Sequence, residues 1–329
     1  MRRVVVTRTT PGRWTLEDAD FVVGPQQGLL DPQALRRFVE QAQPVDALVT
    51  MFHDRVDEAL LHAAGERLSI VCNYASGYEN IDLPACLRAG VTVCNTPDAV
   101  TEGAANMAWA LLLAAARRLH EAGRYVRSPA YPANGPLGMG DFLGVDVAGA
   151  TLLVVGAGRI GAAVAFRSLG FGMRVLYVAR SAKPLLEQAP LCARRVRLEE
   201  GLAQADFVSL HVPLTEQTRH LINQRALSLM KPSAVLINVS RGPVVDEEAL
   251  VQALRDGRLF AAGLDVFERE PHVHPALLTL PNVVLTPHIG SAERGSRKRM
   301  TERILRNLRA HFAGSPAPDA VARPSDPPV

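Results

Sequence analysis

The sequence contains little cysteine, and its charges nearly cancel. The four cysteines, Cys72, Cys86, Cys94 and Cys192, form no C-x-x-C pair and have no histidine at the spacing of a zinc site. We expect buried thiols in a reducing compartment, so neither a disulfide scaffold nor a zinc finger is predicted. The 36 lysine and arginine residues nearly balance the 33 aspartate and glutamate residues. The resulting net charge of +3 is too small to predict a nucleic acid or an acidic membrane as a partner.

Long apolar runs are also lacking. The longest, Met107 to Ala116, is too short to span a bilayer, and the run that begins at Val4 lacks the pattern of a signal peptide. We therefore expect a cytoplasmic protein without a membrane partner.

Two segments could suggest other partners but have simpler interpretations. The basic segment Arg297 to Arg309 carries apolar residues at every fourth position, Met300, Ile304 and Leu308. This period indicates the solvated face of an amphipathic helix rather than a nucleic-acid site. The two histidines of the segment HVHP at 272–275 lack a set of partner ligands, so no metal site is predicted.

The most informative segment runs from Thr151 to Lys183 and has the order strand, glycine turn, helix, strand. Gly156, Gly158 and Gly161 follow the spacing G-x-G-x-x-G. The first glycine would make the tight turn, the second would let the backbone approach a pyrophosphate, and the third would let the helix pack close to the strand. Together with the N-terminus of the helix, they predict a site for a dinucleotide.

The end of the second strand in this segment indicates which dinucleotide is bound. Folds that prefer NAD place an acidic residue here, on the ribose hydroxyls. This chain instead has Arg180, Ser181 and Lys183, which suit the 2′-phosphate of NADP. We therefore predict that NADPH is preferred and that NAD remains possible. The alternative is that the two basic residues only solvate a loop.

The pattern of strands and helices predicts an α/β fold of two doubly wound parallel-sheet domains. A Rossmann cofactor domain over residues 99–288 is expected to be inserted into a smaller, flavodoxin-like substrate domain formed by 1–98 and 289–329. We expect one long helix at 101–127, a connecting loop at 128–149, and then six strands of the cofactor domain. A last helix at about 292–313 precedes a proline-rich tail in which we expect no regular structure.

Three side chains follow different strands of the cofactor domain and are expected to converge at one edge of its sheet. They are Arg241, Glu270 and His288. A histidine can move a proton near neutral pH, a carboxylate can orient it, and a guanidinium can hold an anionic substrate and polarise its carbonyl. Taken singly, they could be a solvated arginine, a loop glutamate and a structural histidine. The loop Asn73 to Tyr78 is either a backbone nest for a carboxylate or an ordinary glycine turn.

The motifs NTPDAVTEGAA, GAGRIG, HVPLTEQTRHLI, MKPSAVLINVSRGPVVDEEALVQAL, GLDVFEREP and NVVLTPHIGS resemble the D-isomer-specific 2-hydroxyacid dehydrogenases. The similarity is greatest to the glyoxylate/hydroxypyruvate reductases. It implies that Arg241 binds the substrate carboxylate and carbonyl, that Glu270 pairs with His288, and that His288 is the acid/base. It also implies a homodimer built through the cofactor domains. In many relatives a tryptophan stands where this chain has Leu137, and an acidic residue stands where it has Asn106.

The resemblance also implies the remaining site residues. The substrate would contact Ser76, Gly77, Arg241 and Ser291. The cofactor would contact Gly156, Gly158, Arg159, Ile160, Gly161, Arg180, Ser181, Lys183, Pro213, Thr218, Val239, Ser240 and Asp265, the last through the nicotinamide carboxamide.

The function expected from the sequence is NADPH-preferring reduction of small 2-oxo acids, glyoxylate to glycolate and hydroxypyruvate to D-glycerate. Two classes of alternative remain open. One is another dehydrogenase of the family, acting on D-lactate, phosphoglycerate or phosphite. The other is a non-catalytic, dinucleotide-sensing protein like the related transcriptional corepressors.

Overall fold

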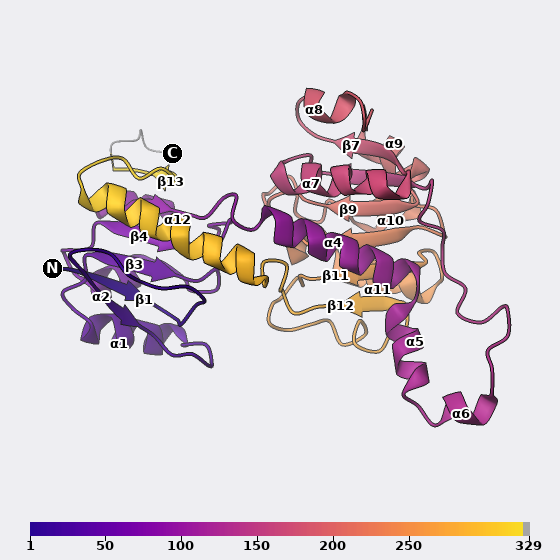
Figure 1. The fold of residues 1–329 in the computed structure, drawn as a ribbon, viewed down its shortest axis with the longest axis horizontal. Coiled ribbons are helices and arrows are strands. Elements are labelled where there is room, and N and C mark those ends of the chain that lie inside the picture. Colours follow the sequence, from indigo (N-terminus) through magenta and orange to yellow (C-terminus); the bar gives the residue numbers. More distant parts are fainter. Residues whose placement is uncertain (325–329) are drawn as a thin grey trace. The chain divides into compact units, whose positions relative to one another are not determined.

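The computed structural model of the chain describes residues 1–324 and divides into two compact units. Unit 1 consists of Met1–Val100 and the segment that begins at Ser291, and unit 2 is Thr101–Gly290. Each unit has its own sheet, with helices on both faces and a hydrophobic core under each face (Figure 1). The predicted fold of two doubly wound α/β domains is confirmed.

The sheet of unit 1 has the order β13-β5-β4-β3-β1-β2. Its strands are β1 (Arg2–Val6), β2 (Ala19–Val23), β3 (Ala47–Thr50), β4 (Ile70–Asn73), β5 (Thr92–Cys94) and β13 (Ala320–Ala322). The first five strands are parallel and have the flavodoxin-like order 2-1-3-4-5. Their apolar residues are buried from both faces, which explains why β3 and β4 are short, continuous apolar runs.

The helices of unit 1 cover both faces of this sheet. The first face is covered by α1 (Pro32–Gln41), α2 (Glu58–Ala64) and α3 (Leu83–Arg88). Each of these begins at an aspartate whose carboxylate accepts hydrogen bonds from the first turn. The second face is covered by α12 (Arg294–Phe312), which buries Met300, Ile304 and Leu308 as its sequence pattern predicts (Figure 1).

Two parts of unit 1 differ from the prediction. The edge strand β2 was not predicted, because most of its residues are only half-buried and it lacks a continuous apolar run. The tail after α12 was expected to have no regular structure, yet β13 pairs antiparallel with β5. Asp319 anchors it, because its carboxylate accepts hydrogen bonds from Arg306 and Asn307 of α12, at 3.1 Å from each. Residues 325–329 of the tail lie outside the described residues.

The sheet of unit 2 has the order β12-β11-β10-β9-β6-β7-β8 and is parallel throughout. Counted along the chain, this is the Rossmann order 3-2-1-4-5-6 with one strand more. The strands are β6 (Thr151–Val155), β7 (Arg174–Val178), β8 (Arg194–Arg195), β9 (Phe207–Leu210), β10 (Val235–Asn238), β11 (Ala261–Leu264) and β12 (Val283–Leu285). Six were predicted, and β8 was missed because two exposed arginines carry no apolar pattern.

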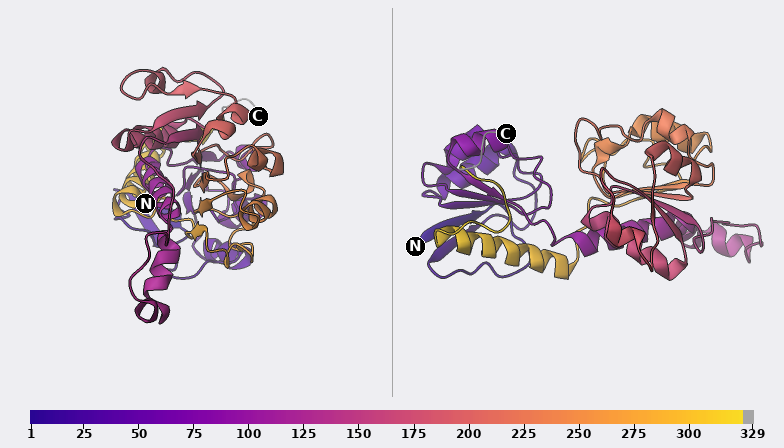
Figure 2. Two further views of the ribbon diagram at one scale, coloured as in Figure 1. Left: turned by 90° about the vertical axis from the view of Figure 1, so that its right-hand side faces the viewer. Right: turned by 90° about the horizontal axis from the view of Figure 1, so that it is seen from above.

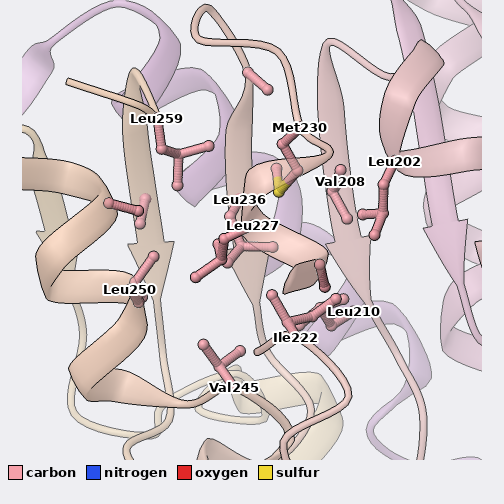
Figure 3. Packing of buried hydrophobic residues seen from close by; sticks show 14 of the residues in the cluster. Leu202, Val208, Leu210, Ile222, Leu227, Met230, Leu236, Val245, Leu250 and Leu259 are labelled. Atoms are coloured by element: carbon pink, nitrogen blue, oxygen red, sulfur yellow. The ribbon is translucent and has the colours of Figure 1, made fainter. Parts of the chain in front are cut away.

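Helices also cover both faces of the second sheet. One face carries α4 (Thr101–Ala116), α7 (Arg159–Arg167) and α8 (Pro184–Glu187), and the other carries α9 (Leu198–Gln204), α10 (Gln224–Ser228) and α11 (Glu247–Arg255) (Figure 2). Leu202 of α9, Leu227 of α10 and Leu250 of α11 pack with apolar side chains of β9 and β10, among them Val208, Leu210 and Leu236, as Figure 3 shows. Short turns of 3-10 helix, η1 (Ser168–Phe171) and η2 (Gly242–Val244), complete the unit.

The predicted long helix at 101–127 is two helices. After α4 the chain bends, and α5 (Leu119–Val126) leads to α6 (Ala130–Asn134) inside the predicted loop. Arg118 has a positive φ of 51° at the bend, and its guanidinium contacts Glu121 at 2.8 Å. The returning chain takes the place of the next helical turn, because Val145 N donates to Ala116 O at 3.0 Å. Val145 N thus occupies Ala116 O in place of an N–H from a further turn of the helix, and α4 ends at Ala116. The alanine-rich pattern of the sequence does not reveal this contact.

Three further observations concern the cysteines, membrane-spanning helices and groups of metal-binding side chains. Cys72, Cys86 and Cys94 are buried, but Cys192 is exposed, so the prediction of four buried thiols is wrong at that position. Within residues 1–324 no helix is long and apolar enough to cross a membrane. The same residues contain no group of three or more histidine, cysteine or acidic side chains that could hold a metal ion.

Candidate active site

The glycine turn after β6 has the geometry that a dinucleotide requires. Gly156 has φ +97°, and a Cβ there would lie 2.7 Å from the carbonyl carbon of His211. A Cβ on Gly161 would lie 2.1 Å from Gly156 O, so α7 packs against the turn only because this residue is glycine. At Gly158, the N-cap of α7, a Cβ would meet no atom within 4 Å. The turn therefore leaves open space in front of the helix N-terminus, where Arg159 and Ile160 begin α7, and the residues fit a pyrophosphate.

Gly158→Ala is expected to separate cofactor binding from stability. Its methyl group enters open space, so the melting temperature should stay unchanged, while the affinity for NADPH should fall by about tenfold or more because the pyrophosphate needs that space. Titration of cofactor fluorescence measures the affinity. The matched control is Gly161→Ala, which should lower stability by roughly 1–3 kcal/mol through the clash with the turn. Wild-type affinity in Gly158→Ala would contradict the assignment of this space.

The loop after β7 contains the residues predicted to select the cofactor. Arg180 and Ser181 are exposed, and Lys183 is half-buried. The hydroxyl of the buried Tyr177 accepts a hydrogen bond from Lys183 N at 2.8 Å and donates one to Glu187. Tyr177 thereby fixes the backbone of the loop at Lys183 and engages the carboxylate of Glu187. The charged side chains within residues 179–183, Arg180 and Lys183, are both basic.

The loop after β9 carries the predicted residues Pro213 and Thr218. Thr218 Oγ1 donates to Pro213 O at 2.6 Å, which closes the loop into a compact turn. The loop is fastened to the glycine turn, because His211 N donates to Val155 O at 2.7 Å. Burial lowers the pKa of His211 to about 3. Its ring therefore stays neutral near pH 7 and cannot act as the proton donor there.

Arg241 stands on a turn that Asn238, the last residue of β10, holds in place. The buried amide of Asn238 donates from Nδ2 to Arg241 O at 3.0 Å. Its Oδ1 accepts hydrogen bonds from the backbone N–H and the hydroxyl of Ser240, at 3.0 and 2.9 Å. Arg241 Nη1 donates to Ser240 O at 2.7 Å, and Val239 is half-buried beside this turn. Arg241, the candidate for substrate binding, is therefore held in place by hydrogen bonds to the backbone of this turn.

The Arg241 turn is packed directly against the loop that carries Glu270. A Cβ on Gly242 would lie 1.8 Å from Phe267 O, so only glycine permits this approach. Glu268 N donates to Oε1 of the buried Glu247 at 2.7 Å, and the Glu268 carboxylate contacts His220 Nε2 at 2.7 Å. These contacts join the loops after β9, β10 and β11 into one rigid edge.

Asp265, directly after β11, holds the backbone around His288. Its Oδ1 accepts from Thr286 Oγ1 at 2.6 Å and from Ile289 N at 2.9 Å, and its Oδ2 accepts from Gly290 N at 2.7 Å. Asp265 O accepts from His288 N at 2.8 Å. Burial raises the pKa of Asp265 above its ordinary value, although these hydrogen bonds oppose the shift. The contacts secure His288 in a left-handed conformation of φ 54°, which costs an L-residue roughly 1–3 kcal/mol. The predicted contact of Asp265 with the carboxamide stays a prediction.

Glu270 and His288 form a hydrogen-bonded pair. His288 Nδ1 lies 2.8 Å from Glu270 Oε2, and Phe267 N donates to Glu270 Oε1 at 3.0 Å. Burial acts to raise the pKa of Glu270, but the hydrogen bond and charge of His288, the Phe267 N–H and the charge of Arg241 outweigh it, so this pKa lies below its ordinary value. Glu270 is therefore a carboxylate at neutral pH. It orients the imidazole through Nδ1, so a proton exchanged with a ligand would pass through Nε2.

Unit 1 contains the predicted carboxylate loop after β4. Asn73 Nδ2 donates to Gly77 O at 2.8 Å, and Asn95 Nδ2 donates to Ser76 O at 2.6 Å. Two carbonyl oxygens are thereby engaged inside the unit, which favours presentation of the neighbouring N–H groups to an anion. Ser291, a predicted substrate contact, is half-buried at the start of the C-terminal part of unit 1.

Two positions that differ from the family pattern have clear environments. Asn106 of α4 accepts a hydrogen bond from Arg167 Nε at 3.1 Å, so it links α4 to α7. Leu137 is exposed, at 48% of its surface, in the segment between α6 and β6.

Most of the residues predicted for unit 2 follow its strands at one edge of the sheet, and Glu270 and His288 are in direct contact. Sequence reasoning missed the residues that support them, notably Asn238, Glu247 and Arg195. A buried asparagine at the end of an apolar strand is a signal that could have indicated Asn238. Nothing in the sequence around Arg195 indicates the hydrogen bonds that it donates to Ala179 O and Arg180 O.

Comparison with known proteins identifies the family. The family model of the D-isomer specific 2-hydroxyacid dehydrogenase NAD binding domain matches residues 109–290. The chain is 52% identical over 289 residues to a glyoxylate reductase of Thermococcus onnurineus, covering 87% of this chain and 85% of the relative. It is 46% identical over 326 residues to a glyoxylate reductase of Thermococcus gammatolerans, covering 97% and 95%.

A solved structure shows the same similarity. The NADPH-dependent glyoxylate/hydroxypyruvate reductase of Sinorhizobium meliloti, in complex with NADP and malonate, is 32% identical and has a TM-score of 0.80. The match covers 98% of this chain and 97% of that chain. Together with the glycine turn and the Glu270–His288 pair, these similarities show that the chain belongs to the D-isomer-specific 2-hydroxyacid dehydrogenases and is an enzyme of that family.

Proposed function

We propose that the protein reduces small 2-oxo acids, glyoxylate and hydroxypyruvate first, and prefers NADPH over NADH. The names of its relatives support a small 2-oxo acid as substrate. The Glu270–His288 pair at the edge of a dinucleotide-binding sheet carries the proposal, because it supplies the proton that a carbonyl reduction requires. In this proposal unit 2 binds the cofactor and unit 1 is the substrate domain. The homodimer and the cytoplasmic location stay predictions.

Each residue has a defined part in the proposed reaction. The reduced nicotinamide, when bound, supplies the hydride for the carbonyl carbon. Arg241 binds the anionic substrate and polarises its carbonyl, since a guanidinium donates several charge-assisted hydrogen bonds. His288 donates the proton from Nε2 to the carbonyl oxygen as the alcohol forms, and Glu270 keeps the ring oriented. In the oxidation direction the neutral ring takes the proton back.

The loop at Ser76 and Gly77 is proposed to bind the substrate carboxylate through backbone N–H groups. The amides of Asn73 and Asn95 support this role because they fix the carbonyl oxygens of the loop. The preference for NADPH is supported by Arg180, Ser181 and Lys183, and by the lack of an acidic residue at the end of β7.

A panel of 2-oxo acids, assayed with NADPH and with NADH by nicotinamide absorbance, tests the proposal. We expect the highest kcat/KM with glyoxylate or hydroxypyruvate. A value about tenfold to a hundredfold higher with NADPH than with NADH is expected, since hydrogen bonds to a charged phosphate contribute roughly 1.5–3 kcal/mol. Pyruvate as the best substrate would favour the D-lactate type instead. A higher kcat/KM with NADH would refute the cofactor preference, and binding without turnover of any substrate would favour a dinucleotide sensor.

A further inference from the structure

The loop that joins β7 to α8 is held by Arg195, an arginine of the short strand β8. Arg195 donates from Nε to Ala179 O at 3.1 Å and from Nη2 to Arg180 O at 2.7 Å. β8 pairs in parallel with β7, and Arg195 lies opposite Tyr177. The guanidinium is thereby brought to the carboxyl end of β7, where a doubly wound fold holds the ribose of a dinucleotide.

These contacts determine the charge that the loop presents. Two consecutive carbonyl oxygens, which would repel a phosphate, are engaged by a cation instead. Each carbonyl that is engaged by Arg195 is unavailable to repel an anion at the exposed Arg180 and Ser181. Arg195 is itself exposed, so it adds a positive charge beside those of Arg180 and Lys183.

The neighbouring arginine of the same strand differs in its contacts. Arg194 Nη1 donates to Glu200 Oε1 at 2.8 Å, and its Nη2 donates to Gln204 Oε1 at 3.0 Å. Its charge is paired on α9, away from the loop after β7. The chain therefore provides two adjacent, exposed arginines, of which one contacts the loop and the other does not.

We propose that Arg195 is a further specificity-determining residue, which selects the 2′-phosphate of the cofactor by holding the carbonyl oxygens of residues 179 and 180 and by adding a third positive charge to the loop. The proposal rests on the proposed preference for NADPH. It extends the phosphate-binding set beyond Arg180, Ser181 and Lys183 to a residue on a different strand.

Direct binding tests the proposal without turnover. The affinities of the full-length protein for adenosine 2′,5′-bisphosphate and for 5′-AMP are measured by calorimetry. Arg195→Ala should weaken binding of the bisphosphate by about threefold to fivefold and leave binding of 5′-AMP unchanged, since only the first ligand carries the phosphate that this exposed charge stabilises. Arg194→Ala is the matched control and should change neither affinity. Arg195→Lys keeps the charge but loses the planar fork, so it should give an intermediate loss.

The outcomes are distinct. The affinities for both ligands could fall equally in Arg195→Ala and Arg195→Lys while the melting temperature stays unchanged. This result would show a purely structural role and overturn the proposal. Unchanged discrimination in Arg195→Ala, in a wild-type protein that favours the bisphosphate, would overturn it while leaving the NADPH preference intact. A wild-type protein that binds both ligands equally would instead refute the NADPH preference itself, and this inference with it.

Discussion

Replacing His288 by asparagine is expected to lower kcat for 2-oxo acid reduction by about 10²–10⁴-fold, the usual contribution of a positioned general acid. Asparagine can still donate a hydrogen bond from its amide nitrogen to the Glu270 carboxylate, but it cannot supply a proton near neutral pH. Cofactor affinity should stay within about twofold of the wild type, because the glycine turn and the loop after β7 are unchanged. Steady-state kinetics and cofactor fluorescence measure the two quantities, and an unchanged kcat would refute the assignment of His288.

The variant Glu270→Gln tests whether the carboxylate beside His288 contributes to the proton transfer. Glutamine keeps the shape of the pair but removes the carboxylate, so the change in reduction rate that accompanies protonation of Glu270 at acid pH in the wild type should be absent. In the wild type the pKa of Glu270 is depressed, so the carboxylate remains ionised down to a pH below its ordinary titration range. The stability that it contributes is therefore present at neutral pH and is lost only as the pH falls through the depressed value. A pH–rate profile identical in Glu270→Gln and the wild type would contradict the role of Glu270.

Replacing Arg241 by alanine is expected to lower kcat/KM for the 2-oxo acid by about 10²–10³-fold or more, through both a higher KM and a lower kcat. The KM rises because the anionic substrate loses a charge-assisted, two-pronged contact. The rate falls because the carbonyl oxygen loses a donor that stabilises its developing negative charge. Saturation kinetics with glyoxylate at fixed, saturating NADPH separates the two effects.

Arg241→Lys is the conservative comparison for the same position. Lysine keeps the charge but not the planar fork, so we expect a loss that lies between alanine and the wild type. Added guanidinium ion should partly restore the rate of Arg241→Ala and not that of Arg241→Lys. If alanine and lysine variants both retained wild-type KM, the substrate would be bound by other residues.

The rigid edge behind these residues explains why each is tested by a conservative substitution. Asn238 holds the backbone of Arg241, and Gly242 lies directly against Phe267, three residues before Glu270. Asp265 holds the turn of His288 in the same way. A larger change at any of these positions would move several groups together, and its effect could not be assigned to one of them.

The sequence by itself determined the parts of this protein that depend on local pattern. Continuous apolar runs such as Leu152–Val155 indicated buried parallel strands, and the spacing of Gly156, Gly158 and Gly161 indicated the dinucleotide turn. The rule that parallel strands end at one edge was enough to select Arg241, Glu270 and His288 together. These features depend on the period of a strand and on the conformational range of glycine, which a short segment contains completely.

Only the tertiary structure decided which groups meet across the fold. The contact of Arg195 with residues 179 and 180 depends on β8 pairing with β7, and a strand of two exposed arginines has no pattern that reveals the pairing. The bend at Arg118 depends on Val145 returning to Ala116, and β13 depends on Asp319 reaching α12. Each is a contact between segments separated along the chain, whose free energy depends on how the elements pack. Local propensity does not contain that information, so these features could be read only from the folded chain.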